Sequence, residues 1–344
     1  MSYYDYNVED LEDFTPFENF LSGIRDNVTQ MKYRGQLEMF LNPRYRWDLS
    51  QQKRMLLPDD ELAVLVNDFV ELIKKNPAKG KEKIKRYVQY VRKQIREGSL
   101  NPNTARSRLK PIKSLLRSNE IEFSWYLIDR NLPKETKSED RAYTREEIQN
   151  MLVHCHDIID KVIIVGFSSG GFRLEAWDYF TWDDVKFFRN DDGTYKGGAL
   201  RVYRGDSEEY WTYVTPEFCN LLDLYREYWR NKFMKEPSTS DPLLVRERSP
   251  FPVRLQHVGI SRRVKKIVDC IGLRDNMMPG KKRYEVQLDH GFRKYFNTML
   301  RRARVNFADK EDMMGHKTGL ESSYERYVEE DIERFSEYQK AFHF

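Results

Sequence analysis

Hydrophobic residues recur at helical spacing through the first third of the chain. Segment 58–75 places its apolar residues three or four positions apart, with acids in its first turn and lysines in its last. Basic helices are expected at about 79–96 and at 104–118, each with an apolar stripe. Segment 16–56 is also expected to be helical, although its aromatic residues follow no clear period. The pattern predicts a small helical domain.

A polar stretch separates this region from the rest of the chain. Residues 129–141 read DRNLPKETKSEDR and are almost without apolar side chains, which is typical of an exposed linker. Thr144 and Glu147 then form a capping box, in which each side chain satisfies a free amide at a helix start. We therefore predict domains at 1–130 and 143–344, joined by a linker at 131–142.

The periodicity changes inside the second domain. Residues 161–182 are apolar enough for a buried helix, whereas 185–214 form short alternating runs broken by Asp-Asp-Gly, Gly-Gly and Arg-Gly-Asp. Two or three antiparallel strands are expected there, with helices in most of the remainder. The tail 332–342 has near-helical spacing and is expected to pack either on its own domain or on a neighbouring protomer. The predicted class is mainly α with a small antiparallel β-sheet (α+β).

Composition narrows the class of protein. The 344 residues are 40% hydrophobic and 14% aromatic, and no run approaches the roughly 18 apolar residues of a membrane span. The first residues lack a secretory pattern, so a cytoplasmic protein is expected without contact to a membrane. The three cysteines lie far apart with no CxxC pair, which argues against disulfides and a zinc site and favours buried thiols.

Charge is unevenly distributed along the chain. The formal net charge is only +4, but residues 1–24 carry six acids and no base. Residues 74–117 carry fifteen Lys or Arg against only Glu82 and Glu97. Such a run fits either a solvated helical face or a surface that binds DNA phosphates.

Four short segments of the second domain carry candidate chemistry. In GFSSGGFRLEAWDYF, Arg173 follows a Gly-rich turn and is expected to open a helix, where its guanidinium can pair with phosphate oxygens. The alternative is a salt bridge with Glu175 or Asp178. In LDHGFRKYF, His290 and Arg293 lie three residues apart, so a helix would bring both toward one small anion. The alternative is an ordinary amphipathic helix.

The other two segments follow closely. Gly315 resembles a helix end, which would leave His316 on a loop. Tyr324 and Tyr327 follow His316 by eight and eleven residues. A phenol attacks phosphorus only when cationic donors stabilise the developing charge and a base takes its proton. Among 21 tyrosines, either one can equally be a packing residue.

Taken together and in order, these motifs resemble the tyrosine recombinase family, the phage-integrase-like enzymes, and look closest to archaeal integrases. The resemblance covers roughly residues 143–330, and the basic helices before the linker fit the family's core-binding domain. It implies a catalytic set of Arg173, the HxxR pair His290 and Arg293, His316, and the nucleophile Tyr324, which is preferred over Tyr327 for its spacing and its Y-x-R context.

Two positions depart from the family pattern. Ala176 stands where a Glu or Asp is frequent, with Glu175 and Asp178 beside it. The family's strand-turn lysine, a general acid, has the candidates Lys196 and Arg204. Arg204 aligns plausibly at the end of its strand, but an arginine holds its proton too tightly to be a good acid, so Lys196 is chosen on chemical grounds.

The resemblance also implies a reaction and partners. Strands of double-stranded DNA would be cut and rejoined at specific sites through a 3′-phosphotyrosine and a Holliday junction. Four protomers would act on two sites, as expected of a mobile element's integrase, without metal, nucleotide or other cofactor. Two alternatives are a non-catalytic DNA-binding protein on the same scaffold and a type IB topoisomerase.

Overall fold

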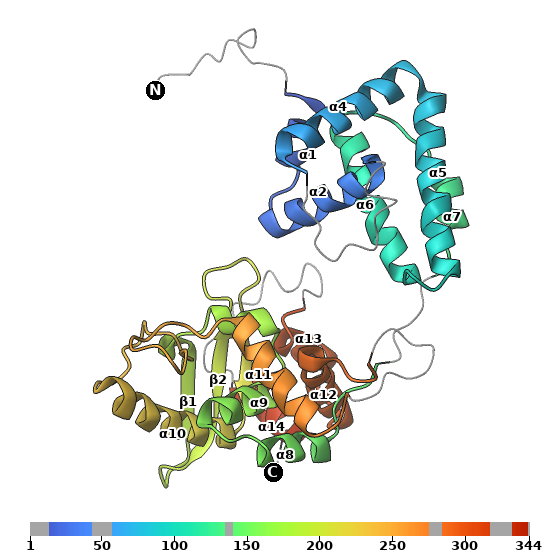
Figure 1. Cartoon of the computed structure of the whole chain (residues 1–344). Coiled ribbons are helices and arrows are strands. Elements are labelled where there is room, and N and C mark those ends of the chain that lie inside the picture. Colours follow the sequence, from blue (N-terminus) through green and yellow to red (C-terminus); the bar gives the residue numbers. More distant parts are fainter. Residues whose placement is uncertain (1–13, 43–56, 135–139, 275–283, 317–331, 343–344) are drawn as a thin grey trace, which may run out of the picture. The chain divides into compact units, whose positions relative to one another are not determined.

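The chain folds into two compact units, Met1–Ser138 and Glu139–Phe344, called here the helical unit and the mixed unit. The computed structural model describes residues 14–42, 57–134, 140–274, 284–316 and 332–342 (Figure 1). Leu132 is buried in the core of the helical unit, and Tyr143 belongs to the core of the mixed unit.

The described part of the helical unit consists of helices. They are α1 (Pro16–Ser22), α2 (Asn27–Leu41), α4 (Asp59–Lys75), α5 (Pro77–Arg96), α6 (Pro102–Ser118) and α7 (Tyr126–Asn131). The helices predicted at 58–75, 79–96 and 104–118 are confirmed as α4, α5 and α6. The last two begin two residues early, because a proline occupies the first turn and the preceding asparagine caps it. Within segment 16–56, α1 and α2 are helical, and 43–56 lies outside the described residues.

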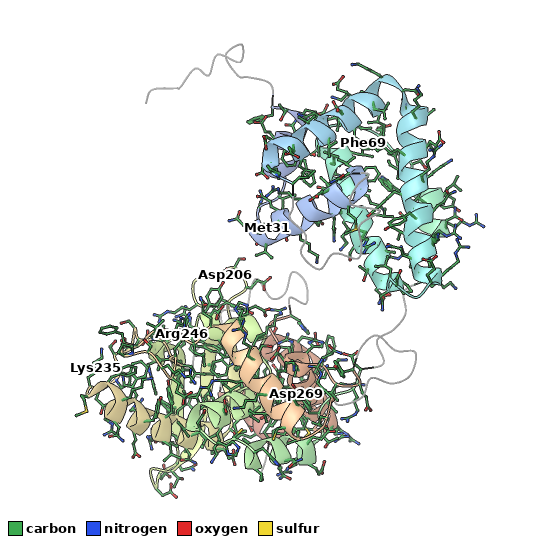
Figure 2. All side chains as sticks on the ribbon, viewed as in Figure 1. Met31, Phe69, Asp206, Lys235, Arg246 and Asp269 are labelled. Atoms are coloured by element: carbon green, nitrogen blue, oxygen red, sulfur yellow. The ribbon has the colours of Figure 1, made fainter. Side chains whose placement is uncertain are left out.

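Aromatic rings fill the core of the helical unit. Phe40 of α2 meets Phe69 of α4 edge to face at 5.0 Å and Tyr87 of α5 at 5.2 Å between ring centroids. Figure 2 shows Phe69 on the inner side of α4. Gly80 of α5 allows the close contact with α4, because an added Cβ would lie 2.5 Å from the side chain of Ile73. The exposed faces of α5 and α6 keep the basic side chains.

The mixed unit combines helices with one small sheet. Its helices are α8 (Arg145–Val153), α9 (Ile158–Gly170), α10 (Pro216–Phe233), α11 (His257–Cys270), α12 (Leu288–Arg302), α13 (Phe307–Met313) and α14 (Ile332–Ala341). The strands β1 (Val185–Arg189), β2 (Tyr195–Val202) and β3 (Tyr210–Val214) pair antiparallel in the order β1-β2-β3. The predicted class, mainly helical with a small antiparallel sheet, is confirmed. Asp206 lies in the turn between β2 and β3 (Figure 2).

The prediction that residues 161–182 are helical is confirmed up to Gly170, but no α-helix opens at Arg173. Helix α9 ends at Gly170, and Gly171 adopts the left-handed conformation with φ of 60°. The chain then forms two short 3-10 segments, Leu174–Asp178 and Trp182–Asp184. The break follows from the glycine and from Phe296, whose ring would lie 2.2 Å from a Cβ at position 171. Arg173 therefore comes after a helix end and before a 3-10 turn.

Helix α14 packs on its own unit, as one of the two alternatives for the tail expected. Phe335, Tyr338 and Phe342 are buried, and the Tyr338 hydroxyl donates to the carbonyl of Ser169 at 3.0 Å.

The three cysteines were all expected to be buried. Cys155 and Cys219 are buried, whereas Cys270 at the end of α11 is exposed. None of the helices in the described residues is both long enough and apolar enough to span a bilayer.

Candidate functional site

Arg293 lies at the centre of a cluster formed by three segments of the mixed unit. It projects from α12 and is 5% exposed. Its Nη1 donates to the carbonyl of Gly171 at 2.7 Å, and its Nη2 donates to the carbonyl of Met314. Both carbonyls belong to cap residues at helix C-termini, those of α9 and α13. Because a helix C-terminus carries partial negative charge, two such ends together stabilise a buried cation.

His316 completes this group from the loop after α13. Gly315 has φ of 63° and turns the chain, as its predicted role at a helix end requires. Nη2 of Arg293 lies 2.9 Å from His316 Nε2, and His316 Nδ1 lies 2.7 Å from Glu311 Oε2. A guanidinium can only donate, so Nε2 accepts and the ring proton sits on Nδ1, facing Glu311. His316 thereby bridges Arg293 and Glu311.

Arg173 brings a second guanidinium to the same place. It lies two residues after Gly171, whose carbonyl binds Arg293, and its side chain is 37% exposed. Its ion pair is with Glu208 of the turn after β2, at 3.4 Å from Nη1 to Oε2. The alternative salt bridge of Arg173 with Glu175 or Asp178 does not form. Asp178 instead accepts from the backbone amide of His257 at 2.6 Å, at the start of α11.

Two tyrosines lie beside the arginines, and sequence reasoning missed both. Tyr203 and Tyr210 flank the β2–β3 turn, with ring centroids 6.3 Å apart. Burial raises the pKa of Tyr210, and the charges of Arg293 and Arg173 oppose this. Burial raises the pKa of Tyr203 to about 12, although the positive charge of Arg173 acts to lower it. In a chain with 21 tyrosines, no sequence signal separates these two from packing residues.

His290 lies one turn before Arg293 on α12, as predicted, but it differs in environment. It is exposed, whereas Arg293 is buried. Desolvation by neighbouring protein atoms lowers the pKa of His290 although part of the ring faces solvent, the positive charges of Lys294 and Arg293 lower it further, and Asp140 acts in the opposite direction. Lys294 in turn donates to the carbonyl of Asp140 at 2.7 Å. The ring is therefore biased toward its neutral form.

The structure does not bring Lys196 to this cluster. Lys196 is the second residue of β2, and its Nζ lies 5.7 Å from the centre of the Phe335 ring. Six residues of strand, or about 20 Å, separate it from the end of β2, where Tyr203 and Glu208 approach Arg173. Arg204 does lie in that turn, but it pairs with Asp183 and, at 3.7 Å, with Asp184.

The two tyrosines predicted as nucleophile candidates, Tyr324 and Tyr327, lie outside the described residues. Within the described ranges, no group of three or more His, Cys, Asp or Glu side chains is placed to hold a metal ion.

Comparison with known proteins gives structural likeness only. No family model matches the sequence, and no curated protein matches it. The integrase of the Tn1549 transposon in complex with transposon right end DNA is 14% identical, with a TM-score of 0.49 over 94% of this chain and 99% of that one. XerH site-specific recombinase bound to a palindromic difH substrate is 14% identical, with a TM-score of 0.48 over 92% and 93%. A lambda integrase dimer bound to a COC′ core site is 13% identical, with a TM-score of 0.46 over 83% and 93%.

Proposed function

We propose that this chain is a site-specific DNA recombinase that cleaves and rejoins strands through a 3′-phosphotyrosine. One observation carries the proposal: Arg173, Arg293 and His316, which are up to 143 positions apart in the sequence, converge on one small region of the mixed unit. Two guanidiniums at one place are the donors that a phosphodiester needs as charge develops on its oxygens, and His316 helps to hold one of them, that of Arg293.

The two arginines suit different parts of this task. Arg293 is fixed by two backbone carbonyls and His316, so its plane is set before DNA arrives. Arg173 is more exposed, and its partner Glu208 is 61% exposed. We propose that a DNA phosphate takes the place of this carboxylate, because the phosphate offers two oxygens to the guanidinium. Binding thus exchanges a weak surface ion pair for a bidentate contact with phosphate.

The chemical step that we propose is an in-line displacement at phosphorus. The phenolic oxygen of Tyr324 forms a bond to phosphorus, the bond from phosphorus to the 5′ oxygen breaks, and the released oxygen takes up a proton. His290, which is biased toward its neutral form, accepts the phenol proton. The ester keeps the energy of the broken bond, so the 5′-hydroxyl of a partner strand reverses the step without ATP.

The source of the proton for the leaving oxygen departs from the sequence-based assignment. Lys196 was chosen for this role, but it lies at the other end of β2 from Arg173. Arg204 is close in the chain to Tyr203, yet its ion pair with Asp183 raises an arginine pKa that is already high. We therefore propose that water supplies this proton and that Lys196 has no catalytic part.

The helical unit is proposed to bind the DNA duplex. Its α5 and α6 carry most of the basic run at 74–117, in which Lys81, Arg92, Lys110 and Arg117 are among the exposed cations. Phosphate contacts by such side chains release counterions and make binding salt-dependent. We further propose four protomers on two DNA sites, with strands exchanged through a Holliday junction.

One observation favours a second candidate, a non-catalytic DNA-binding protein on the same scaffold. The turn from Tyr203 to Glu209 contains Arg204 and no lysine, so the usual general acid is missing there. Such a protein would bind DNA with the same cationic cluster but would form no covalent ester.

A nicked suicide duplex tests the proposal. Its sequence is first selected from random duplexes that the protein binds, and its nick lets the short 5′-hydroxyl fragment diffuse away after cleavage. We expect a protein-DNA adduct on a denaturing gel for the unmodified chain and for Tyr327→Phe, and none for Tyr324→Phe.

Each other result has a defined meaning. An adduct that persists in Tyr324→Phe moves the nucleophile to Tyr327. The absence of any adduct from bound duplexes supports the non-catalytic candidate, and relaxation of supercoiled DNA without site preference indicates a type IB topoisomerase.

A further inference from the structure

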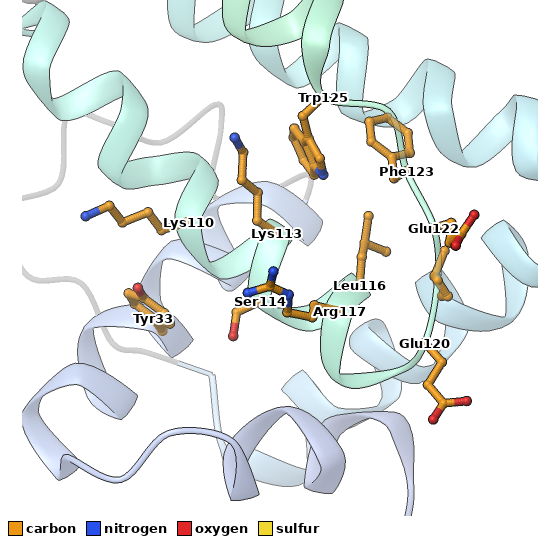
Figure 3. Close-up of a pocket in the computed structure, with 11 residues that line it drawn as sticks. Tyr33, Lys110, Lys113, Ser114, Leu116, Arg117, Glu120, Glu122, Phe123 and Trp125 are labelled. Atoms are coloured by element: carbon orange, nitrogen blue, oxygen red, sulfur yellow. The ribbon is translucent and has the colours of Figure 1, made fainter.

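The helical unit contains a cavity of about 740 Å³, and two of its lining cations, Lys110 and Arg117, also belong to the proposed DNA-binding face. One wall is α6, which contributes Lys110, Lys113 and Arg117, all on one face of the helix (Figure 3). The aromatic side chains Tyr33, Phe123 and Trp125 line it as well. A cavity of this size with aromatic side chains and a few charges is typical of a binding site.

The positive charge of this cavity comes mainly from two of its cations. Lys113 is neutralised, since its Nζ lies 2.9 Å and 2.8 Å from the carboxylate oxygens of Asp129 and 4.9 Å from the centre of the Trp125 ring. Lys110 and Arg117 are exposed and form no ion pair with any described residue. These two side chains are therefore ready to receive carboxylates.

Two acids limit where an anionic ligand can lie. Glu120 and Glu122 extend from the loop after α6, on the opposite side of the cavity from Lys110 (Figure 3). Like charges repel, so an acidic ligand would follow the α6 wall and place apolar groups toward the loop. A duplex, with phosphates along two strands, fits such a divided surface less well than a single peptide does.

We propose that the occupant is the chain's own acidic segment, residues 1–13. The segment MSYYDYNVEDLED carries five carboxylates and no basic side chain, together with three tyrosines, Val8 and Leu11. Its carboxylates match Lys110 and Arg117, and its rings match Phe123 and Trp125. No other stretch of similar length in the first 130 residues combines this charge with this aromatic content.

The start of the described chain lies beside the cavity. Asn119, at the end of α6 between the lining residues Arg117 and Glu120, donates from Nδ2 to the carbonyl of Pro16 at 3.0 Å. Thirteen residues extend up to about 45 Å, which is ample to reach the cavity from this point. Because the segment is tethered, its effective concentration at the cavity is in the millimolar range, so weak contacts suffice.

A consequence rests on the proposed function. Carboxylates on Lys110 and Arg117 would compete there with DNA phosphates for two of the exposed cations of α6. The segment would then reduce non-specific DNA binding, as an internal acidic competitor.

Photo-crosslinking in the full chain, without DNA, tests the proposal. Tyr6→p-benzoylphenylalanine is irradiated, and the crosslinked peptides are identified by mass spectrometry. We expect a crosslink within one chain to residues 110–125. The double variant Lys110→Glu/Arg117→Glu should lower its yield about tenfold. The matched control Lys81→Glu/Arg92→Glu, which makes the same charge change on α5, should leave the yield unchanged.

Salt provides a measurement that needs no change in the cavity. Raising the ionic strength from 0.05 to 1 M should lower the yield in the otherwise unmodified protein, because exposed charges are screened. Crosslinks to other regions, crosslinks between two chains that increase with protein concentration, or a yield indifferent to both charge reversal and salt would each overturn the proposal. Since DNA is absent, failure here leaves the recombinase proposal standing.

Discussion

At the scale of single residues, the burial of Arg293 needs an explanation. Removing a guanidinium from water is costly, and burial lowers the pKa of Arg293, as does the charge of Arg173. The cost is offset by two carbonyl oxygens at helix C-termini and by the acceptor nitrogen of His316. Such an arrangement holds the cation rigidly and leaves a local excess of positive charge, which is what an anion-binding site requires.

His290 should titrate below its ordinary value. Desolvation and the charges of Lys294 and Arg293 lower its pKa from the usual 6.5, so the unfolded chain binds this proton more tightly than the folded chain. Stability from this group is present above pH 6.5 and decreases as the pH falls below it. An NMR titration assigned through loss of the signal in His290→Gln measures the pKa. A value at or above 6.5 in the DNA-free protein would contradict the electrostatic description.

At the scale of elements, two glycine-ended helices build the cluster. Gly171 follows the end of α9 and Gly315 lies just after the end of α13, with φ of 60° and 63°. Each turn is tightly packed, since an added Cβ would lie 2.2 Å from Phe296 at position 171 and 2.4 Å from Tyr210 at position 315. These turns aim the carbonyls of Gly171 and Met314 at Arg293 and place His316 beside it.

The substitution Gly315→Ala should therefore destabilise the protein more than backbone strain alone explains. Gly193→Ala is the matched control, since Gly193 has φ of 84° and an added Cβ meets nothing within 4 Å. Left-handed backbone costs an alanine about 1 to 2 kcal/mol, and the contact with Tyr210 should add about 1 to 3 kcal/mol. Chemical denaturation measures both variants. Equal losses would mean that Tyr210 does not restrict this turn.

The elements that sequence patterns predicted are those with strong periodicity or clear turn residues. The helices at 58–75 and 79–96 and the sheet within 185–214 belong to this group. The capping box at Thr144 and Glu147 also forms, with Thr144 accepting from the Glu147 amide at 3.2 Å. At 161–182 apolar content predicted helix beyond the point where α9 ends, because a buried helix and a buried turn have the same composition. The left-handed conformation of Gly171 is what ends the helix.

Candidate site residues were harder to predict, because their partners are distant in the sequence. The spacing of His290 and Arg293 placed both on one helix, but nothing local indicated that Arg293 would be buried against Gly171 and Met314. Lys196 was chosen for its chemistry, and only the length of β2 reveals its distance from Arg173. Tyr210 could not be recognised from the sequence as a neighbour of the arginines, because its position depends on packing against Gly315, which is distant in the chain.

At the scale of the whole molecule, the two units have separate cores. The buried cluster of the helical unit runs from Phe17 to Leu132, and that of the mixed unit from Tyr143 to Phe342, with no shared residue. Each unit is also long enough to form a stable core by itself, because the boundary between Ser138 and Glu139 leaves the length of an ordinary domain on either side.

The fragment Glu139–Phe344 should accordingly fold without the helical unit. We expect a cooperative thermal transition by circular dichroism, at a midpoint within a few degrees of a transition in the full chain. It should retain the Arg293 cluster but bind duplex DNA more weakly, because the basic face at 74–117 is missing. A fragment without a cooperative transition would show that the mixed unit depends on the other unit for stability.

We propose that Arg173 and Arg293 neutralise the charge of one DNA phosphate, so a scissile phosphate that lacks this charge should remove most of the need for them. Cleavage of a suicide duplex is compared between an ordinary scissile phosphate and a neutral methylphosphonate, in the unmodified chain and in Arg173→Ala. We predict that Arg173→Ala lowers cleavage of the ordinary duplex by at least a hundredfold and that the methylphosphonate restores most of that loss. An equal loss on both duplexes would contradict the claim.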